Sequence, residues 1–270
     1  MLIKKKRISI SDIATLKKEF ALKGLNTVCQ SAKCPNIGEC FKNKRATFLI
    51  LGKNCTRNCQ FCAVEKQKPQ SLDPVEPLKT AQAIKALNLS YAVITSVTRD
   101  DLQDGGAYHF AKTISAVRKI CPYCKIEVLV PDFLGDVKNI DIVLKAKPDV
   151  FSHNLEMPKN FYSKLRTYSD YNRSLSVLQY AKSFNFKIKT GIMVGLGESK
   201  KEIFETVNDI KNLKTDVLTI GQYLSPSKKH YPVIKEYSDS EFEELADFAK
   251  TLGIKDVVAG RYVRSSYFPA

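Results

Sequence analysis

The feature that most constrains the fold is an alternation of short apolar runs with amphipathic segments, which begins near residue 46. Six apolar runs are each followed by a segment whose apolar residues recur at helical spacing. The predicted strands are 46–52, 91–97, 125–131, 149–156, 186–195 and 216–224. Strands that alternate with helices of this length pair in parallel, so the pattern predicts an α/β fold of about six β/α units, either a barrel or an open doubly wound sheet. The last helix is predicted at 238–253, with Ser238 or Ser240 as its N-cap.

Four polar or cysteine-containing segments follow predicted strands. "CTRNCQFC" (55–62) follows the first strand and "TRDDLQDGG" (98–106) the second, while "HNLE" (153–156) ends the fourth and "GLGE" (195–198) follows the fifth. In barrels and in open α/β sheets, functional residues gather at the C-terminal ends of the strands. We therefore expect these segments to converge on one active site.

Six of the eight cysteines lie within 34 residues, in two groups of three. The group Cys55, Cys59 and Cys62 has the spacing C-x3-C-x2-C. Three thiolates can hold three irons of a cubane cluster and leave the fourth iron open to a chelating ligand. A zinc site is the alternative, although zinc sites usually show paired C-x2-C elements. Clustered cysteines of this kind are more typical of metal binding or redox chemistry than of a disulfide scaffold.

The second group, Cys29, Cys34 and Cys40, has the wider spacing C-x4-C-x5-C. Alone, this pattern is also compatible with a set of zinc ligands. Beside the first group it indicates a second iron–sulfur cluster that is again one cysteine short. Another protein group must then supply the fourth ligand.

The chain carries a formal charge of +15, from 43 basic and 28 acidic side chains. Such a surface favours a polyanion, a membrane surface or an acidic protein partner, or it is simply a solvated lysine-rich surface. We expect no nucleic-acid partner, because the sequence has no zinc-finger spacing and no RNA-binding aromatic signature. No apolar run approaches the roughly 20 residues of a membrane span, and the basic N-terminus is not followed by an apolar segment. We therefore expect a cytoplasmic protein without a membrane partner.

The loop 55–62, with its aromatic Phe61, resembles the C-x3-C-x-Φ-C signature of the radical S-adenosylmethionine (SAM) superfamily. In that superfamily SAM occupies the open iron position, which makes Phe61 a candidate cofactor-binding residue. "CQSAKCPNIGECF" before this loop, together with "RSSY" at 264–267, closely resembles the lipoyl synthase family. Further family-like segments follow in family order: "TSVTRDDLQDGGA", "IEVLVPDF", "SHNLE", "YNRSL", "KTGIMVGLGE" and "GQYLSPSKKHYPV". The resemblance therefore covers nearly the whole chain.

The resemblance implies a partial TIM barrel of about six β/α units at 46–253. It also implies an N-terminal cysteine-rich extension at 1–45, which carries auxiliary-cluster ligands, and a C-terminal tail at 254–270. In this family a serine of the RSSY motif completes the auxiliary cluster. The candidates here are Ser265 and Ser266, and Ser266 is favoured.

Contacts to SAM are also implied by resemblance. "HNLE" is similar to the "HNLD" of biotin synthase, which implies that Asn154 and Glu156 hold the SAM ribose. Arg173 is predicted to pair with the methionine carboxylate, because a guanidinium group matches a carboxylate in geometry. Asp100 and Asp101 are candidates either for polar contacts to SAM or substrate or for helix capping.

The activity implied by the resemblance is that of a radical SAM sulfurtransferase. Two sulfur atoms are inserted at C6 and C8 of an octanoyl group that is attached to a lysine of a lipoyl carrier protein, either an E2 lipoyl domain or a glycine-cleavage H protein. The implied cofactors are SAM and two [4Fe-4S] clusters, of which the auxiliary cluster donates the sulfur. An electron donor such as ferredoxin or flavodoxin is also implied. No catalytic residue is assigned beyond the cluster ligands.

Two alternatives stay open from the sequence. One is another radical SAM sulfur-inserting enzyme, similar to biotin synthase, and the other is a non-enzymatic two-cluster electron carrier. The additional pair Cys121 and Cys124, in "CPYC", is compatible with a redox or metal pair or with two incidental thiols.

Overall fold

The computed structural model describes residues 24–28, 36–42 and 45–266 of the 270-residue chain. These residues form two compact units. The first unit comprises the described residues up to Thr56, together with 63–133 and 138–149, and the second comprises 57–62, 134–137 and the described residues from 150 onward.

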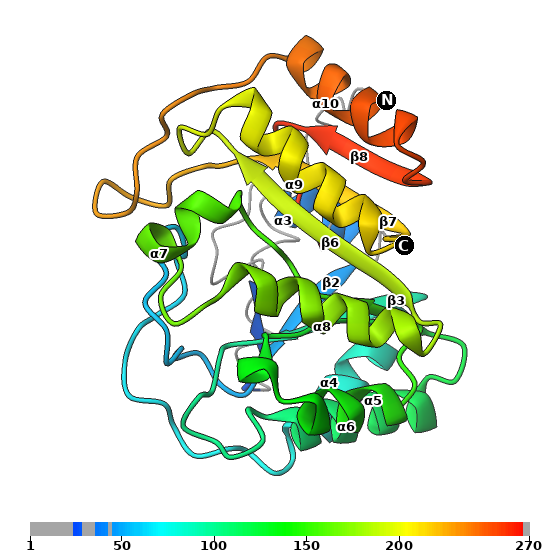
Figure 1. Cartoon of the computed structure of the whole chain (residues 1–270). Helices are drawn as coiled ribbons and strands as arrows, with labels where there is room; N and C mark the ends of the chain where they lie inside the picture. The colour runs from blue at the N-terminus through cyan, green and yellow to red at the C-terminus, as the bar shows by residue number, and fades with distance from the viewer. Residues whose placement is uncertain (1–23, 29–35, 43–44, 267–270) are drawn as a thin grey trace. The chain divides into compact units, whose positions relative to one another are not determined.

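The first unit is built on the adjacent strands β1 (Asn26–Thr27), β2 (Ala46–Ile50), β3 (Tyr91–Ser96) and β4 (Lys125–Leu129). β1 runs antiparallel to β2, and the other pairs are parallel. Its helices are α3 (Ile37–Lys42), α4 (Glu76–Ala86), α5 (Ala107–Ile120) and α6 (Val137–Lys145). All five residues of β2 are buried, and α4 packs against α5 (Figure 1). Burial on both faces explains why the parallel strands appear in the sequence as continuous apolar runs.

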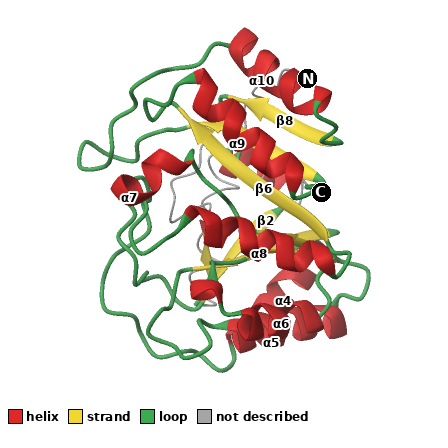
Figure 2. Ribbon diagram, viewed as in Figure 1, coloured by secondary structure: helices red, strands yellow, loops and turns green. Residues whose placement is uncertain are grey.

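The second unit is built on the adjacent parallel strands β5 (Val150–Ser152), β6 (Lys187–Val194), β7 (Val217–Gln222) and β8 (Asp256–Gly260). Its helices are α7 (Tyr162–Leu165), α8 (Tyr171–Ser183), α9 (Lys200–Asn212) and α10 (Asp239–Thr251), as the ribbon in Figure 2 shows. Short 3₁₀ turns occur at Phe133–Gly135 and Lys159–Phe161.

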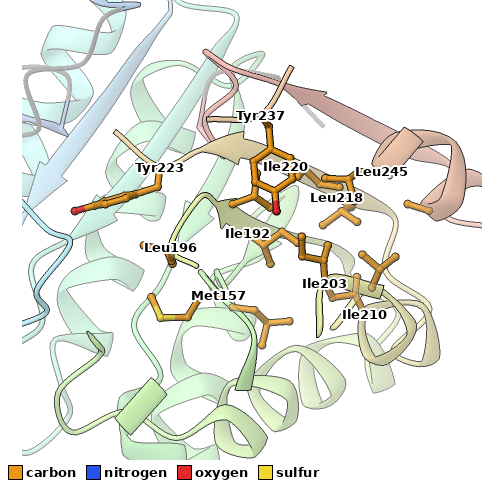
Figure 3. Close-up of a cluster of buried hydrophobic side chains, with 14 of the residues drawn as sticks. Met157, Ile192, Leu196, Ile203, Ile210, Leu218, Ile220, Tyr223, Tyr237 and Leu245 are labelled. Atoms are coloured by element: carbon orange, nitrogen blue, oxygen red, sulfur yellow. The ribbon is translucent and has the colours of Figure 1, made fainter. Parts of the chain in front are cut away.

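An apolar cluster forms the core of the second unit (Figure 3). Leu218 and Ile220 of β7 meet Ile203 of α9 and Leu245 of α10, and all four side chains are at most 3% exposed. Each such side chain contributes about 1.5–3 kcal/mol when it is fully buried. This packing between helices and strands fixes the strand ends from which the polar loops emerge.

The α/β prediction is confirmed, and all six predicted strands are present. The six β/α units are β2–α4, β3–α5, β4–α6, β5–α8, β6–α9 and β7–α10. The structure adds α3 within the predicted extension 1–45 and β8 within the predicted tail 254–270. β8 was not predicted, because it is formed only by the short run "DVVAG", whose residues are exposed or partly exposed. No helix among the described residues is both long and apolar enough to cross a membrane.

Capping boxes begin two helices of the second unit. In α10 the Ser238 hydroxyl accepts a hydrogen bond from the Glu241 backbone N–H, and the Glu241 carboxylate accepts one from the Ser238 N–H at 2.8 Å. Of the two predicted N-cap candidates, Ser238 and Ser240, Ser238 is the residue that caps α10. Ser199 and Glu202 form the same arrangement at α9.

We expect Ser238→Ala to lower the free energy of unfolding of the metal-free chain by about 1 kcal/mol, because the first turn of α10 loses its cap. Urea denaturation followed by circular dichroism measures this change. The matched control is Ser176→Ala, at an exposed position inside α8, where alanine is a better helix former and no loss is expected. An equal loss in both variants would contradict the capping role.

Candidate functional site

The loop 55–62, called the cysteine loop below, is held in its first part by backbone hydrogen bonds within the first unit. The Cys55 N–H donates to the Glu65 carbonyl at 2.9 Å, and the Thr56 N–H donates to the Thr98 carbonyl at 3.0 Å. The Cys55 residue is partly exposed. The predicted proximity of the cysteine loop to the loop after β3 is therefore confirmed at this point.

The remainder of the loop is anchored within the second unit. Gln60 donates from its N–H to the Leu165 carbonyl at 2.9 Å and accepts from the Tyr231 N–H at 3.0 Å. Phe61 packs against the apolar cluster of this unit. The Cys62 N–H donates to the Cys59 carbonyl at 3.2 Å, and both cysteines are partly exposed. The chain between the two cysteines is thus fixed by backbone bonds and by one aromatic anchor.

Cys55, Cys59 and Cys62 are three partly exposed thiol donors. Within the described part of the chain, no group of three or more His, Cys, Asp or Glu side chains could hold a metal ion, and no disulfide consumes a thiol. Of the second group, Cys40 is buried on α3, whereas Cys29 and Cys34 lie outside the described residues. Partly exposed thiols on a short anchored loop fit a site that assembles around its metal, since preformed sites are rare without metal.

The segment after β5 places two predicted residues together. The Asn154 Nδ2 donates to Glu156 Oε1 at 3.1 Å and to Ser265 Oγ at 3.0 Å. Glu156 has the left-handed φ of 69°, and its backbone N–H donates to the Gly191 carbonyl at 2.9 Å. Burial raises the pKa of the Glu156 carboxyl, while the Arg166 charge and the Asn154 amide oppose this shift.

A buried amide oxygen lies at this segment. Asn154 Oδ1 is buried and forms no hydrogen bond among the described residues. A Cβ added at Gly191 would lie 3.3 Å from this oxygen and 2.5 Å from Thr219 Oγ1, so only glycine leaves the space open. An unsatisfied buried acceptor beside a carboxylate suits a ligand that brings hydroxyl donors. The residues therefore fit the ribose that the sequence resemblance implied.

Arg166 is a functional candidate that the sequence analysis missed. Its Nη1 donates to the Asn154 carbonyl at 3.1 Å and to the Tyr162 hydroxyl at 2.8 Å. Tyr162 in turn donates to the Leu155 carbonyl at 2.5 Å. These bonds fix the backbone carbonyls of Asn154 and Leu155 in the "HNLE" segment. No local sequence pattern marks Arg166, because its partners are identified only by the fold.

Arg173 lies in the first turn of α8. Its N–H donates to Asp170 Oδ1 at 2.7 Å, and its Nη2 donates to the Tyr168 carbonyl at 2.5 Å. A Cβ at Gly135 would lie 3.1 Å from Arg173 Cδ, so the arginine stem lies over this glycine. Its predicted contact with the SAM carboxylate stays a prediction.

The two aspartates after β3 bind protein groups. Asp101 accepts two hydrogen bonds of 2.8 Å from Arg99, and these bonds hold the pKa of the Asp101 carboxyl below its usual value. Asp100 accepts a hydrogen bond of 3.2 Å from the Thr56 hydroxyl. Neither caps α5, whose N-cap is Gly106.

The two serines of the C-terminal motif differ in their surroundings. Ser265 Oγ accepts the hydrogen bond from Asn154 described above. Ser266 is half-buried, and within the described residues its hydroxyl forms no hydrogen bond. The choice of Ser266 over Ser265 as the auxiliary-cluster ligand stays a prediction.

The additional cysteine pair lies at the end of α5. The Cys124 N–H donates to the Cys121 carbonyl at 3.0 Å, and no disulfide joins the two residues. Burial raises the pKa of the Cys124 thiol to about 11. Because the thiolate is the reactive form, the pair lacks the lowered pKa of a redox-active cysteine motif.

We expect Cys124 of the folded, metal-free protein to resist alkylation by iodoacetamide at pH 8. A pKa of about 11 leaves a thiolate fraction on the order of a hundredfold below that of an ordinary cysteine. Tandem mass spectrometry of the peptide measures the labelling rate, and the same residue in urea-unfolded protein is the control. Equal rates in folded and unfolded protein would contradict the assignment.

Comparisons with protein-family models and with curated proteins indicate the same family. The family model described as the radical SAM superfamily matches residues 49–210. Curated relatives named lipoyl synthase come from Caldicellulosiruptor saccharolyticus (53% identical, covering 96% of this chain and 90% of the relative) and Aquifex aeolicus (45% identical, covering 96% and 95%).

Solved structures show the same fold at low sequence identity. The [FeFe]-hydrogenase maturase HydG has a TM-score of 0.64 at 13% identity, covering 92% of this chain and 63% of that one. SuiB of Streptococcus suis, bound to S-adenosylmethionine, has a TM-score of 0.61 at 15% identity, covering 93% and 60%. Methylornithine synthase PylB has a TM-score of 0.60 at 13% identity, covering 93% and 75%. These likenesses concern the fold, and they confirm the predicted partial barrel.

Proposed function

The chain belongs to the lipoyl synthase family of the radical SAM superfamily, and from this membership we propose how its residues serve the reaction. It is a sulfurtransferase of lipoate biosynthesis that inserts two sulfur atoms at C6 and C8 of an octanoyl group on a lipoyl carrier protein. The observation that carries this conclusion is the high identity to curated lipoyl synthases over almost the whole chain. Neither the biotin-synthase-like alternative nor the electron carrier accounts for that identity.

SAM and two [4Fe-4S] clusters are the cofactors of this activity. When bound, SAM and the first cluster supply a 5′-deoxyadenosyl radical, and the auxiliary cluster serves as the sulfur-donating substrate. Cys55, Cys59 and Cys62 hold the first cluster. The donor set supports this role, because three thiolates leave one iron for SAM.

The auxiliary cluster takes its ligands from both ends of the chain. Cys29, Cys34 and Cys40 provide three thiolates, and Ser266 provides the fourth ligand. The hydrogen bond between Ser265 and Asn154 supports the choice of Ser266, because Ser265 already has a partner. A hydroxyl oxygen is a weaker ligand for iron than a thiolate, which suits a cluster that gives up its sulfur.

The residues after β5 bind the SAM nucleoside. Asn154 Oδ1 accepts a hydrogen bond from a ribose hydroxyl, which gives this buried oxygen the partner that it lacks among the described residues. Glu156 accepts from the neighbouring hydroxyl, and Arg166 positions both residues through the Asn154 carbonyl. Arg173 binds the methionine carboxylate, while Phe61 contributes to cofactor binding from within the anchored cysteine loop. These residues bind and orient, since C6 and C8 carry no acidic hydrogen that a general base could remove.

The substrate is an octanoylated lipoyl carrier protein, an E2 lipoyl domain or a glycine-cleavage H protein. A ferredoxin or flavodoxin supplies the electrons, and the enzyme acts in the cytoplasm without a membrane or nucleic-acid partner. The net charge of +15 supports an acidic protein partner, because opposite charge accelerates association. This steering would weaken as salt is added.

The serine assignment is tested with Ser266→Ala and its neighbour Ser265→Ala as the matched control. The protein is prepared without oxygen, loaded with iron and sulfide, and given dithionite, SAM and an octanoyl-lysine peptide. Wild type should hold about eight iron atoms per chain and form both 5′-deoxyadenosine and lipoyl product. Ser266→Ala should still form 5′-deoxyadenosine but lose at least about tenfold in lipoyl product, because the auxiliary cluster lacks its fourth ligand.

The control should retain its auxiliary iron, because Ser265 is not assigned to the cluster. Full sulfur insertion by Ser266→Ala, or loss of auxiliary iron in Ser265→Ala alone, would contradict the assignment. Wild-type protein that is fully loaded yet releases no 5′-deoxyadenosine would contradict the proposed function itself.

A further inference from the structure

Cys55, the first cysteine of the cysteine loop, is followed by Thr56, whose side chain contacts the loop after β3. The Thr56 Oγ1 lies 3.0 Å from the Thr98 carbonyl and 3.2 Å from Asp100 Oδ2, both of which can accept its proton. The same oxygen accepts the Asp100 backbone N–H at 3.1 Å. With the backbone bond from Thr56 to Thr98, these contacts join Thr56 to three polar groups of one loop.

The loop that receives Thr56 is itself fixed by a buried arginine. Arg99 is 3% exposed, and its guanidinium donates to both oxygens of Asp101 at 2.8 Å. Its Nη1 also donates to the Leu51 carbonyl at 3.1 Å. Arg99 therefore connects the loop after β3 to the end of β2, where the cysteine loop begins.

A second buried side chain, Glu76, binds the backbone N–H just before the cysteine loop. Leu51 has a φ of 69°, and its N–H donates to Glu76 Oε2 at 2.9 Å. The same carboxylate oxygen lies 2.7 Å from His109 Nε2, and both side chains are buried. Both backbone polar groups of Leu51 are thus bound by buried side chains, four residues before Cys55.

We propose that the loop Thr98–Asp101 is a positioning element for Cys55, and that the Thr56 hydroxyl is the contact through which it acts. Leu51 is fixed before the cysteine, Thr56 is fixed after it, and the Cys55 N–H is bound to Glu65. The direction of the Cys55 thiol therefore depends on Thr56. Thr56 and Asp100 are positioning residues, because their contacts reach Cys55 through the backbone of the loop.

This inference rests on the proposed function, since it assigns Cys55 to the cluster that binds SAM. A small displacement of one thiolate leaves enough donors to load iron but changes the geometry that the open iron offers to SAM. The expected defect is therefore in SAM binding by the loaded protein, with iron content retained. A purely structural role would instead lower stability and iron content together.

The decisive variant is Thr56→Val, which removes the hydroxyl and keeps the shape and the backbone N–H. In the full-length protein, loaded with both clusters and reduced, the Kd for SAM is measured from the change that SAM causes in the electron paramagnetic resonance spectrum. We expect Thr56→Val to raise this Kd about fivefold to tenfold, which corresponds to the loss of one partly buried, hydrogen-bonded hydroxyl. Thr56→Ser retains the hydroxyl and should stay within about twofold of wild type.

The matched control is Thr80→Val, the same substitution in α4 of the same unit. The Thr80 hydroxyl is buried and has no hydrogen-bond partner among the described residues, so its loss should leave the Kd within about twofold. A wild-type Kd and spectrum in loaded Thr56→Val would overturn the proposal. If Thr56→Val does not load, Asp100→Ala must show the SAM-binding defect, and a wild-type Kd in that variant would also overturn it. Wild-type protein that binds SAM preserves the proposed function in either case.

Discussion

The start of the cysteine loop depends on buried charged side chains that hold the main chain at Leu51. Arg99 binds the carbonyl of this residue, and Glu76 binds its N–H. Arg99 is also bound to Asp101, and Glu76 is also bound to His109, so each of the two buried side chains is held by a second contact. Apolar packing adds a steric constraint, since a Cβ at Gly106 would lie 2.3 Å from Leu51 Cδ1. The turn that leads into the loop is therefore specified by charge and by shape together.

The second unit uses the same principle at the end of β5. Arg166 and Tyr162 bind backbone carbonyls of the "HNLE" segment, and Glu156 is held with a left-handed φ. Such a backbone conformation costs roughly 1–3 kcal/mol and persists where the surroundings enforce it. The apolar cluster of Figure 3 supplies that enforcement through β6 and β7. The polar residues proposed to bind SAM thus lie next to strands whose positions are fixed by the apolar cluster.

Apolar periodicity was sufficient to predict the strands β2 to β7 and the helices of the six β/α units, because this signal is local. Cysteine spacing is a local signal too, and the first set of thiol ligands that it indicates stays a prediction. The contacts that orient the ligands could not be predicted in this way. Glu76 lies 25 residues from Leu51 and 33 from His109 in the sequence, and only the fold brings them together. Arg166 and the bond between Asn154 and Ser265 were missed for the same reason. The serine motif was identified only by resemblance to the family, because its residues alone are also typical of a solvated chain terminus.

In the proposed function, one chain performs both radical generation and sulfur donation, with separate ligand sets for the two clusters. The most direct test is a single turnover of protein whose clusters were rebuilt with heavy-isotope sulfide, in buffer that contains only ordinary sulfide. Mass spectrometry of the lipoyl product should find both inserted sulfur atoms heavy, in an amount limited by the loaded auxiliary cluster. Product that contains only ordinary sulfur would contradict the assignment of the second cysteine group and Ser266 as holders of the sulfur donor.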